Sequence, residues 1–246
     1  MGRSQQVAAI VVGHTDYGES DRILRLVTPE RGRVSAMARG ARKSKKRFGG
    51  TLDLGNRVDL ILTTGRGKLP LITQSDLVRG TGHVRDSLEG LALLPYLCEW
   101  VEALSQADHL EPKLFGVLDV ALAVLDAATA PPTPVFRWGL EAKALTFAGL
   151  TPVLTACAAC GEALEDAAIY QPSAGGVLHP DCGDGIELTP GWWAQVEHAR
   201  RTPLAELVDI EPVGVLGNWA LHSHLEWHLG RGLRSQKMLV ELGGVA

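Results

Sequence analysis

Residues 22–28 read RILRLVT and residues 57–64 read RVDLILTT, and these two stretches decide the fold of the amino-terminal part of the chain. Apolar and polar residues alternate in the first stretch, which is typical of a β-strand with one buried face. Three further β-rich stretches, at residues 7–13, 33–38 and 69–78, are set off by turns that contain glycine or proline. Short strands at this spacing predict a small β-barrel of about five strands over residues 1–80.

A dense run of cations lies between the third and fourth predicted strands. Residues 39–47 read RGARKSKKR, which places six cations within nine residues: Arg39, Arg42, Lys43, Lys45, Lys46 and Arg47. Such a run repels itself and cannot enter a core, so it is either solvated or neutralised by a polyanion. An isolated run is more often a solvated loop, but this one projects from a rigid barrel, where binding segments tend to lie. We therefore predict that this segment binds nucleic-acid phosphates.

The charge is distributed unevenly along the chain. Residues 1–79 contain 15 Lys and Arg against 7 Asp and Glu, a net charge of +8, whereas residues 80–246 contain 9 against 21, a net charge of −12. A polyanion responds to the local field of the face that it meets, because salt screens charges beyond about 8–10 Å. The overall charge of −4 therefore does not argue against a nucleic-acid partner for the amino-terminal part.

The composition is that of a globular protein, with 46% hydrophobic residues in a chain of 246. No stretch approaches the roughly 18–20 uninterrupted apolar residues of a membrane span, and residues 1–10 lack the apolar region of a signal peptide. We therefore expect a cytoplasmic protein with no membrane partner. Its four cysteines are then expected to be reduced and able to bind a metal.

The remainder of the chain is predicted to be largely helical. Apolar residues recur at helical spacing over residues 87–106, and further helices fit residues 113–128, 135–148, 190–201 and 212–230, before a short tail from Leu233. Cys98 is interpreted as a small buried side chain. We expect these side chains of the first and last helices to face the core: Leu91, Leu94, Leu97, Val101 and Leu104, and Leu216, Trp219, Leu221, Leu225 and Leu229.

The other three cysteines lie in a loop-rich insert. Cys157-x2-Cys160 is followed, after eighteen residues, by His179-x2-Cys182, which is the spacing of a two-knuckle zinc site. Each x2 pair lets a tight turn point two ligands at one ion. Because four protein ligands complete the tetrahedron and leave no position for water, we predict one structural Zn2+ per chain.

Motifs of the common enzyme classes are absent or misplaced in this sequence. A zinc deaminase has H-x-E before P-C-x-x-C, whereas here His179 follows the cysteine pair. In His224-Leu-Glu-Trp-His228 the glutamate does not directly follow the first histidine, as a metalloprotease requires, so a cluster of surface histidines that includes His222 is the favoured interpretation. Phosphate-binding glycine loops and the G-x-S-x-G elbow are missing. We predict that the protein is not an enzyme.

The predicted barrel also contains an acidic turn and very few aromatic residues. The acidic residues of Gly18-Glu19-Ser20-Asp21 have no matched partner nearby in the sequence and are interpreted as a solvated turn. Tyr17 and Phe48 are the only aromatic residues before Gly80, whereas sequence-tolerant single-strand binders stack bases on several rings. Binding is therefore expected to be mainly to phosphate, salt-dependent, and to leave base edges free to pair.

The sequence resembles the RecO family of bacterial recombination mediators over almost its whole length. The resemblance rests on GHTDYGESDRILRLVTPERGRVSAMARGARKSK at residues 13–45 and on CAACG and GGVLHPDC in the insert. It implies an α+β multidomain fold. An OB-fold barrel would occupy residues 1–80, a helical domain residues 81–155 and 187–246, and an inserted zinc-binding module residues 156–186.

The same resemblance implies an activity without catalysis. Members of the family bind single- and double-stranded DNA, anneal complementary strands and, with RecR, help RecA to displace single-stranded DNA-binding protein, whose C-terminal tail they also bind. RecF and RecA are implied as indirect partners, and the location as cytoplasmic and nucleoid-associated. Two alternatives stay open from the residues alone: a zinc-containing RNA-binding or transcription accessory factor, and a metal-dependent nuclease or deaminase.

Overall fold

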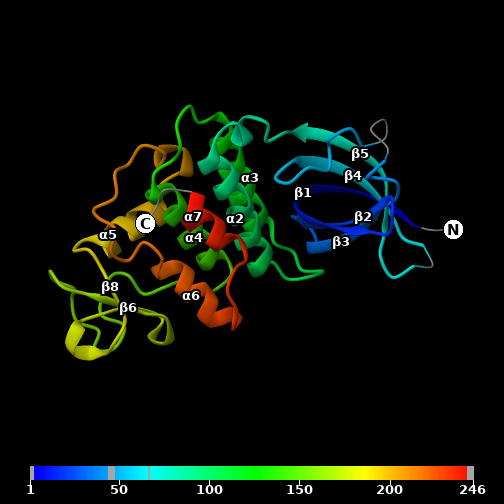
Figure 1. Ribbon diagram of the computed structural model, residues 1–246. Helices are drawn as coiled ribbons and strands as arrows, with labels where there is room; N and C mark the ends of the chain where they lie inside the picture. Colours follow the sequence, from blue (N-terminus) through cyan, green and yellow to red (C-terminus); the bar gives the residue numbers. More distant parts are fainter. Residues whose placement is uncertain (1–2, 44–47, 66, 243–246) are drawn as a thin grey trace. The chain divides into compact units, whose positions relative to one another are not determined.

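The computed structural model describes residues 3–43, 48–65 and 67–242 of the chain. It divides into two compact units, residues 1–126 and 127–246. The first unit consists of a β domain followed by two helices, and the second is mainly helical and carries a small sheet (Figure 1). The division into units thus falls within the region predicted as the first part of the helical domain, because two helices group with the strands.

The first unit contains the five strands that the sequence predicts. They are β1 (Ser4–Tyr17), β2 (Asp21–Thr28), β3 (Gly32–Ala38), β4 (Arg57–Thr63) and β5 (Leu71–Arg79). They form a closed barrel in the order β1-β2-β3-β5-β4, in which β1 also pairs with β4. The contact between β3 and β5 is parallel and consists of the single pair Met37 and Leu71, whereas the other contacts are antiparallel ladders.

Strand β1 is longer than predicted because it serves two neighbours. Its first half pairs with β4, and its second half pairs with β2, in a ladder whose register shifts between Val11 and Gly13. A shift of this kind bends the strand and increases its twist, which helps a sheet to close. The Arg25 side chain lies over Gly13, and a Cβ added there would lie 2.1 Å from its guanidinium and would displace it. That guanidinium extends to Glu102, with 2.8 Å between Nε and Oε1.

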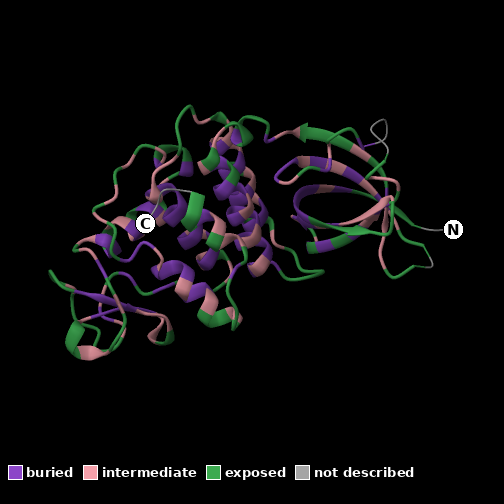
Figure 2. Cartoon of the chain, in the orientation of Figure 1, coloured by how far each residue is buried: buried purple, intermediate pink, exposed green. Residues whose placement is uncertain are grey.

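Alternating side chains of the strands fill the barrel interior, as the period-2 pattern predicts. Leu24, Leu26, Val58 and Leu60 are fully buried, and Phe48 and Leu52 join the same core from the segment between β3 and β4. Figure 2 shows buried segments along the strands of the barrel.

Helices α2 (Leu88–Leu104) and α3 (Pro112–Ala127) complete the first unit. The Ser87 hydroxyl caps α2 by accepting the Gly90 N–H at 3.0 Å. The prediction that Cys98 is buried is confirmed, and Leu94, Leu97, Val101 and Leu104 are buried as expected. The prediction for Leu91 is wrong, since this side chain is 42% exposed.

The second unit is built from α4 (Pro134–Phe147), α5 (Trp192–Arg201), α6 (Ala220–Leu229) and α7 (Ser235–Leu242). Helix α4 packs against α5 and α6. The rings of Trp138 and Tyr170 meet Trp192 edge to face, with centroids 5.8 and 5.9 Å away, respectively. Such aromatic packing supplies much of the buried area of a small helical core.

Two predictions for the carboxyl-terminal helices are wrong. The helix expected at residues 212–230 begins only at Ala220, because Gly214 and Gly217 occupy tight positions in a turn-rich approach, and Leu216 is exposed. The tail from Leu233, for which no helix was predicted, contains a further helix, α7. None of the described helices is long and apolar enough to cross a membrane.

The predicted loop-rich insert contains a small sheet. Strands β6 (Ile169–Gln171), β7 (Gly176–Leu178) and β8 (Ile186–Glu187) form an antiparallel arrangement in the order β7-β6-β8. Ile169 and Leu178 pack with Cys157 in a separate small cluster. So small a core stabilises little on its own, which is typical of modules that depend on a metal.

Candidate nucleic-acid interface and metal site

The start of the basic segment is fixed to the turn between β1 and β2. The Asp21 carboxylate accepts the Gly40 N–H at 2.8 Å and the Ser20 hydroxyl at 2.8 Å. The Gly40 N–H, followed by the Ser20 hydroxyl, lowers the pKa of Asp21 below its ordinary value. Gly40 has a φ of +70°, a conformation that glycine adopts without strain. The chain therefore turns at a defined point just before Arg42.

Arg42 and Lys43 contact the same turn through charge. Arg42 donates from Nη1 to the Gly18 carbonyl at 2.9 Å, and its Nε lies 3.3 Å from Asp16 Oδ2. Lys43 Nζ lies 3.6 Å from Glu19 Oε2. The interpretation of the acidic turn as a solvated turn without partners is therefore wrong. Strand pairing brings it against the basic segment, although the two are about 20 residues apart in the sequence.

The described cations of the segment are accessible to solvent. Arg39 is exposed, and the side chains of Arg42 and Lys43 are 38% and 66% exposed. Lys45, Lys46 and Arg47, which belong to the predicted phosphate-binding set, lie outside the described residues. Three of the six predicted binding residues are thus presented together at one end of the barrel, held by hydrogen bonds at their base.

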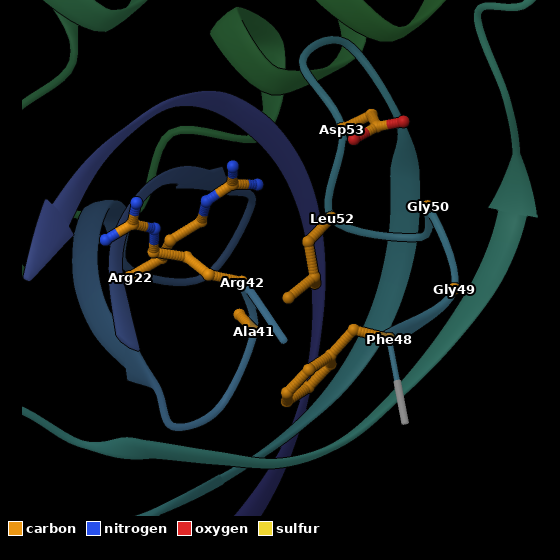
Figure 3. A pocket seen from close by; sticks show the side chains of 8 residues that line it. All are labelled: Arg22, Ala41, Arg42, Phe48, Gly49, Gly50, Leu52 and Asp53. Atoms are coloured by element: carbon orange, nitrogen blue, oxygen red, sulfur yellow. The ribbon is translucent and has the colours of Figure 1, made fainter. Parts of the chain in front are cut away.

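A pocket of about 420 Å3 lies beside this segment. Figure 3 shows Arg22 and Arg42 along one side of the pocket and Phe48 and Leu52 along the other. The full lining is Arg22, Ala41, Arg42, Phe48, Gly49, Gly50, Leu52 and Asp53. This pocket could not be predicted from the sequence, because its walls come from β2 and from both ends of the segment between β3 and β4. The one local signal was Phe48, an isolated aromatic directly after the cations.

The second site is formed by the predicted metal ligands. One ligand atom from each of Cys157, Cys160, His179 and Cys182 lies within 4.8 Å of all the others. The turn at Cys157 brings the first pair together, since the Gly161 N–H donates to the Cys157 carbonyl at 2.9 Å. The second pair flanks a short turn at residues 180–182, where the Cys182 N–H donates to the His179 carbonyl.

The orientation of His179 fits a metal ligand. Its Nε2 lies 2.9 Å from the Ala163 carbonyl, which can only accept, so Nε2 carries the proton. Nδ1 then carries the lone pair and faces Cys160 Sγ at 3.4 Å and Cys182 Sγ at 3.9 Å. Metal-binding histidines are characteristically oriented by a hydrogen bond of this kind from the other ring nitrogen.

The thiols have different proton affinities. Burial raises the pKa of Cys157, but the N–H groups of Cys160, His179 and Ala159 lower it further than burial raises it, to about 6. Burial, followed by contacts with Cys157 and Cys160, raises the pKa of Cys182 to about 11. One thiolate is therefore already favoured near neutral pH. Three sulfurs and one imidazole in a tetrahedral arrangement are the donors that Zn2+ prefers in structural sites.

The other histidines do not form the predicted surface cluster. Of the three histidines on α6, His222 and His224 are buried and His228 is exposed. The Tyr170 hydroxyl and His224 Nδ1 are 2.9 Å apart, and His224 Nε2 lies 3.1 Å from the Leu150 carbonyl. Burial, followed by the charge of His228, lowers the pKa of His224 to about 4. His224 is therefore a neutral core residue that joins β6 to α6.

Comparison with known proteins gives consistent matches. The profile described as Recombination protein O N terminal matches residues 1–81, and Recombination protein O C terminal matches residues 85–237. Proteins named DNA repair protein RecO are similar over nearly their full length. The one from Anaeromyxobacter dehalogenans (strain 2CP-C) is 36% identical over 97% of this chain and 96% of its own, and that from Myxococcus xanthus is 34% identical over 96% of each.

Proposed function

Because the chain belongs to the RecO family, we propose that it is a DNA repair and recombination mediator that binds single- and double-stranded DNA and anneals complementary strands. With RecR, it would assist the loading of RecA onto DNA coated by single-stranded DNA-binding protein, whose C-terminal tail it would also bind. RecF and RecA would be indirect partners, and the protein would act in the cytoplasm at the nucleoid.

The observation that carries this proposal is the anchored start of the basic segment. Hydrogen bonds from Gly40 and Arg42 hold the backbone to the β1–β2 turn, while Arg39, Arg42 and Lys43 remain exposed. Anchoring reduces the conformational entropy that these side chains lose when they bind a strand. The strand order of the barrel also supports an OB-type domain, a fold that commonly binds single strands.

The mechanism we propose is electrostatic. The cations would neutralise phosphates on two strands at once and so reduce their mutual repulsion, which otherwise opposes annealing. Contacts to phosphate leave the base edges unread, so the two strands can find their register by base pairing. No nucleotide hydrolysis is needed, because pairing itself supplies the free energy.

The Cys157, Cys160, His179 and Cys182 group would hold one structural Zn2+ in the second unit. A bound zinc ion would cross-link the two turns that carry the ligands. The ligands themselves keep the turns in place through the Cys157 and Cys182 backbone hydrogen bonds and through the contact of His179 with Ala163. In this role the group stabilises the module and takes no part in binding DNA.

A strand-annealing assay tests the proposal, with complementary oligonucleotides and with or without RecR and single-strand binder. Replacing Arg39, Arg42, Lys43, Lys45, Lys46 and Arg47 by Gln should abolish annealing and leave zinc content and circular dichroism unchanged. The slope of log affinity for single strands against log salt should fall by up to about 4, at roughly 0.7 for each lost phosphate contact.

A matched pair of double variants controls for net charge. Both pairs remove two exposed cations of the same unit, so they change the net charge equally. Arg42→Gln with Lys43→Gln should weaken binding more than Arg3→Gln with Lys68→Gln, because only the first pair lies in the basic segment. Equal effects, or undiminished annealing by the six-residue variant, would contradict the assignment of this segment. RNA oligonucleotides in the same salt series test the alternative of an RNA-binding factor.

A further inference from the structure

We infer that the pocket beside the basic segment holds one unpaired nucleotide of the bound strand, with its phosphate at Arg22 and Arg42 and its base at Phe48, Leu52 and Asp53. The inference rests on the proposed function and adds to it a site for a single nucleotide. The nucleotide would be either the last one of a strand or one extruded from a duplex.

The size and walls of the pocket suit this ligand. Its volume of about 420 Å3 lies within the range of ordinary small-molecule sites. Phe48 and Leu52 are 3% and 4% exposed, so they form a firm apolar wall that belongs to the barrel core. Gly49 and Gly50 line the pocket without side chains, which lets a flat ring approach the backbone closely.

The two arginines form the end of the pocket that would bind phosphate. Arg22 Nε lies 3.0 Å from Asp16 Oδ1, and Arg42 Nε lies 3.3 Å from Asp16 Oδ2, so one carboxylate holds both guanidiniums side by side. Each guanidinium has five N–H donors in a fixed plane. The Nε contact with Asp16 uses one donor of each, and Arg42 uses a second, from Nη1, on the Gly18 carbonyl. A phosphate suits paired arginines because each can bind it through two parallel donors.

Asp53 adds a negatively charged group to a pocket that also contains two arginines. Its carboxylate can only accept hydrogen bonds, so it favours a ligand that also carries N–H donors. A nucleotide combines an anionic phosphate with such donors on its base. Guanine fits best, because its N1–H and 2-amino group can donate to one carboxylate together, whereas thymine offers a single N–H. We therefore expect the pocket to prefer guanine to thymine.

The test compares DNA forms on the full chain by fluorescence anisotropy. The ligands are a single strand that ends in a 5′-phosphorylated guanine, the same strand ending in thymine, a blunt duplex, and a duplex with one unpaired internal guanine. Ala41→Phe fills the pocket without changing charge, and Arg22→Gln removes the phosphate contact. Arg3→Gln is the matched control, because it also removes one arginine but lies away from the pocket. Arg3 directly precedes the first residue of β1, whereas Asp16, which holds Arg22 and Arg42, lies near the end of that strand.

Ala41→Phe and Arg22→Gln should each lower affinity about tenfold, equivalent to about 1.4 kcal/mol, for at least one of the two ligands with an unpaired guanine. The affinity of these two variants for the blunt duplex should change less than twofold. The affinity of Arg3→Gln for each of the four ligands should also change less than twofold. Asp53→Asn should remove the preference for guanine. A loss confined to the single strand identifies a terminal nucleotide, and a loss confined to the internal guanine identifies an extruded one.

Two results would overturn the inference. One is unchanged affinity of both Ala41→Phe and Arg22→Gln for the single strand ending in guanine and also for the duplex with the unpaired guanine, while the wild-type chain binds DNA; this result would leave the proposed function intact. The other is an equal loss on blunt duplex and single strand, since a fully paired duplex offers no nucleotide to the pocket. If the wild-type chain binds none of the four ligands, the proposed function itself fails. Circular dichroism confirms that each variant is folded.

Discussion

The basic segment and the Cys/His group are the two candidate sites of this chain, and they are held together by opposite means. The basic segment gathers like charges, which repel, and its described part keeps its place through contacts with the acidic β1–β2 turn. The Cys/His group gathers four ligand atoms that lie within 4.8 Å of one another. The first site is suited to a large, mobile polyanion, and the second to one small ion.

The difference determines how each site responds to its surroundings. Interactions between exposed charges weaken with salt and are individually worth less than about 1 kcal/mol. Metal coordination involves bonds of fixed length, and its binding free energy contributes directly to folding. We therefore expect changes in the second unit to alter stability, and changes near the basic segment to alter DNA affinity.

The largest effect is expected from the metal ligands. Cys157→Ser and Cys182→Ser should lower the zinc stoichiometry and reduce the free energy of unfolding by about 3 kcal/mol or more, because the module has little core of its own. Metal analysis and denaturant titration measure both quantities. Cys98→Ala is the control, since Cys98 is buried in α2 and should leave the zinc content at one per chain. One tightly bound metal in both serine variants would contradict the site.

An intermediate effect is expected from pH. The pKa of His224 is lowered to about 4 from its ordinary 6.5, so protonation favours the unfolded chain. The stabilisation is complete above pH 6.5 and is lost as the pH falls from 6.5 to 4, by about 3 kcal/mol in all. Denaturant titrations at several pH values should show this slope, and His224→Gln should remove it. Identical pH profiles of the two proteins would exclude His224 as the source.

The smallest effect is expected from the anchor of the basic segment. Asp21→Ala removes the acceptor of the Gly40 N–H and should weaken single-strand binding about threefold, a loss of less than 1 kcal/mol. Glu30→Ala removes the same charge from an exposed turn and is the matched control. On charge alone both variants should bind DNA more tightly. Tighter binding by Asp21→Ala would therefore show that the hydrogen bond to Gly40 contributes nothing to DNA binding. It would contradict the conclusion that contacts with the β1–β2 turn hold the basic segment in its binding position.

Much of the fold follows from local patterns. The five predicted strands are all present because alternation reports which residues of a strand face a core. The convergence of Cys157, Cys160, His179 and Cys182 could be predicted because each pair sits on one short turn. The helix at residues 212–230 was overextended, since its apolar spacing continued through glycines that the turn-rich segment requires.

The sequence by itself determined the basic run, the approximate positions of the five barrel strands and the Cys/His group, because each depends on residues that are near neighbours in the chain. Only the tertiary structure decided that Asp21 holds Gly40, that Arg22 and Asp53 share a pocket, and that His224 is buried beside Tyr170. These contacts join residues 19, 31 and 54 positions apart. The pairing of strands and the packing of elements bring such residues together, and no local pattern specifies that pairing.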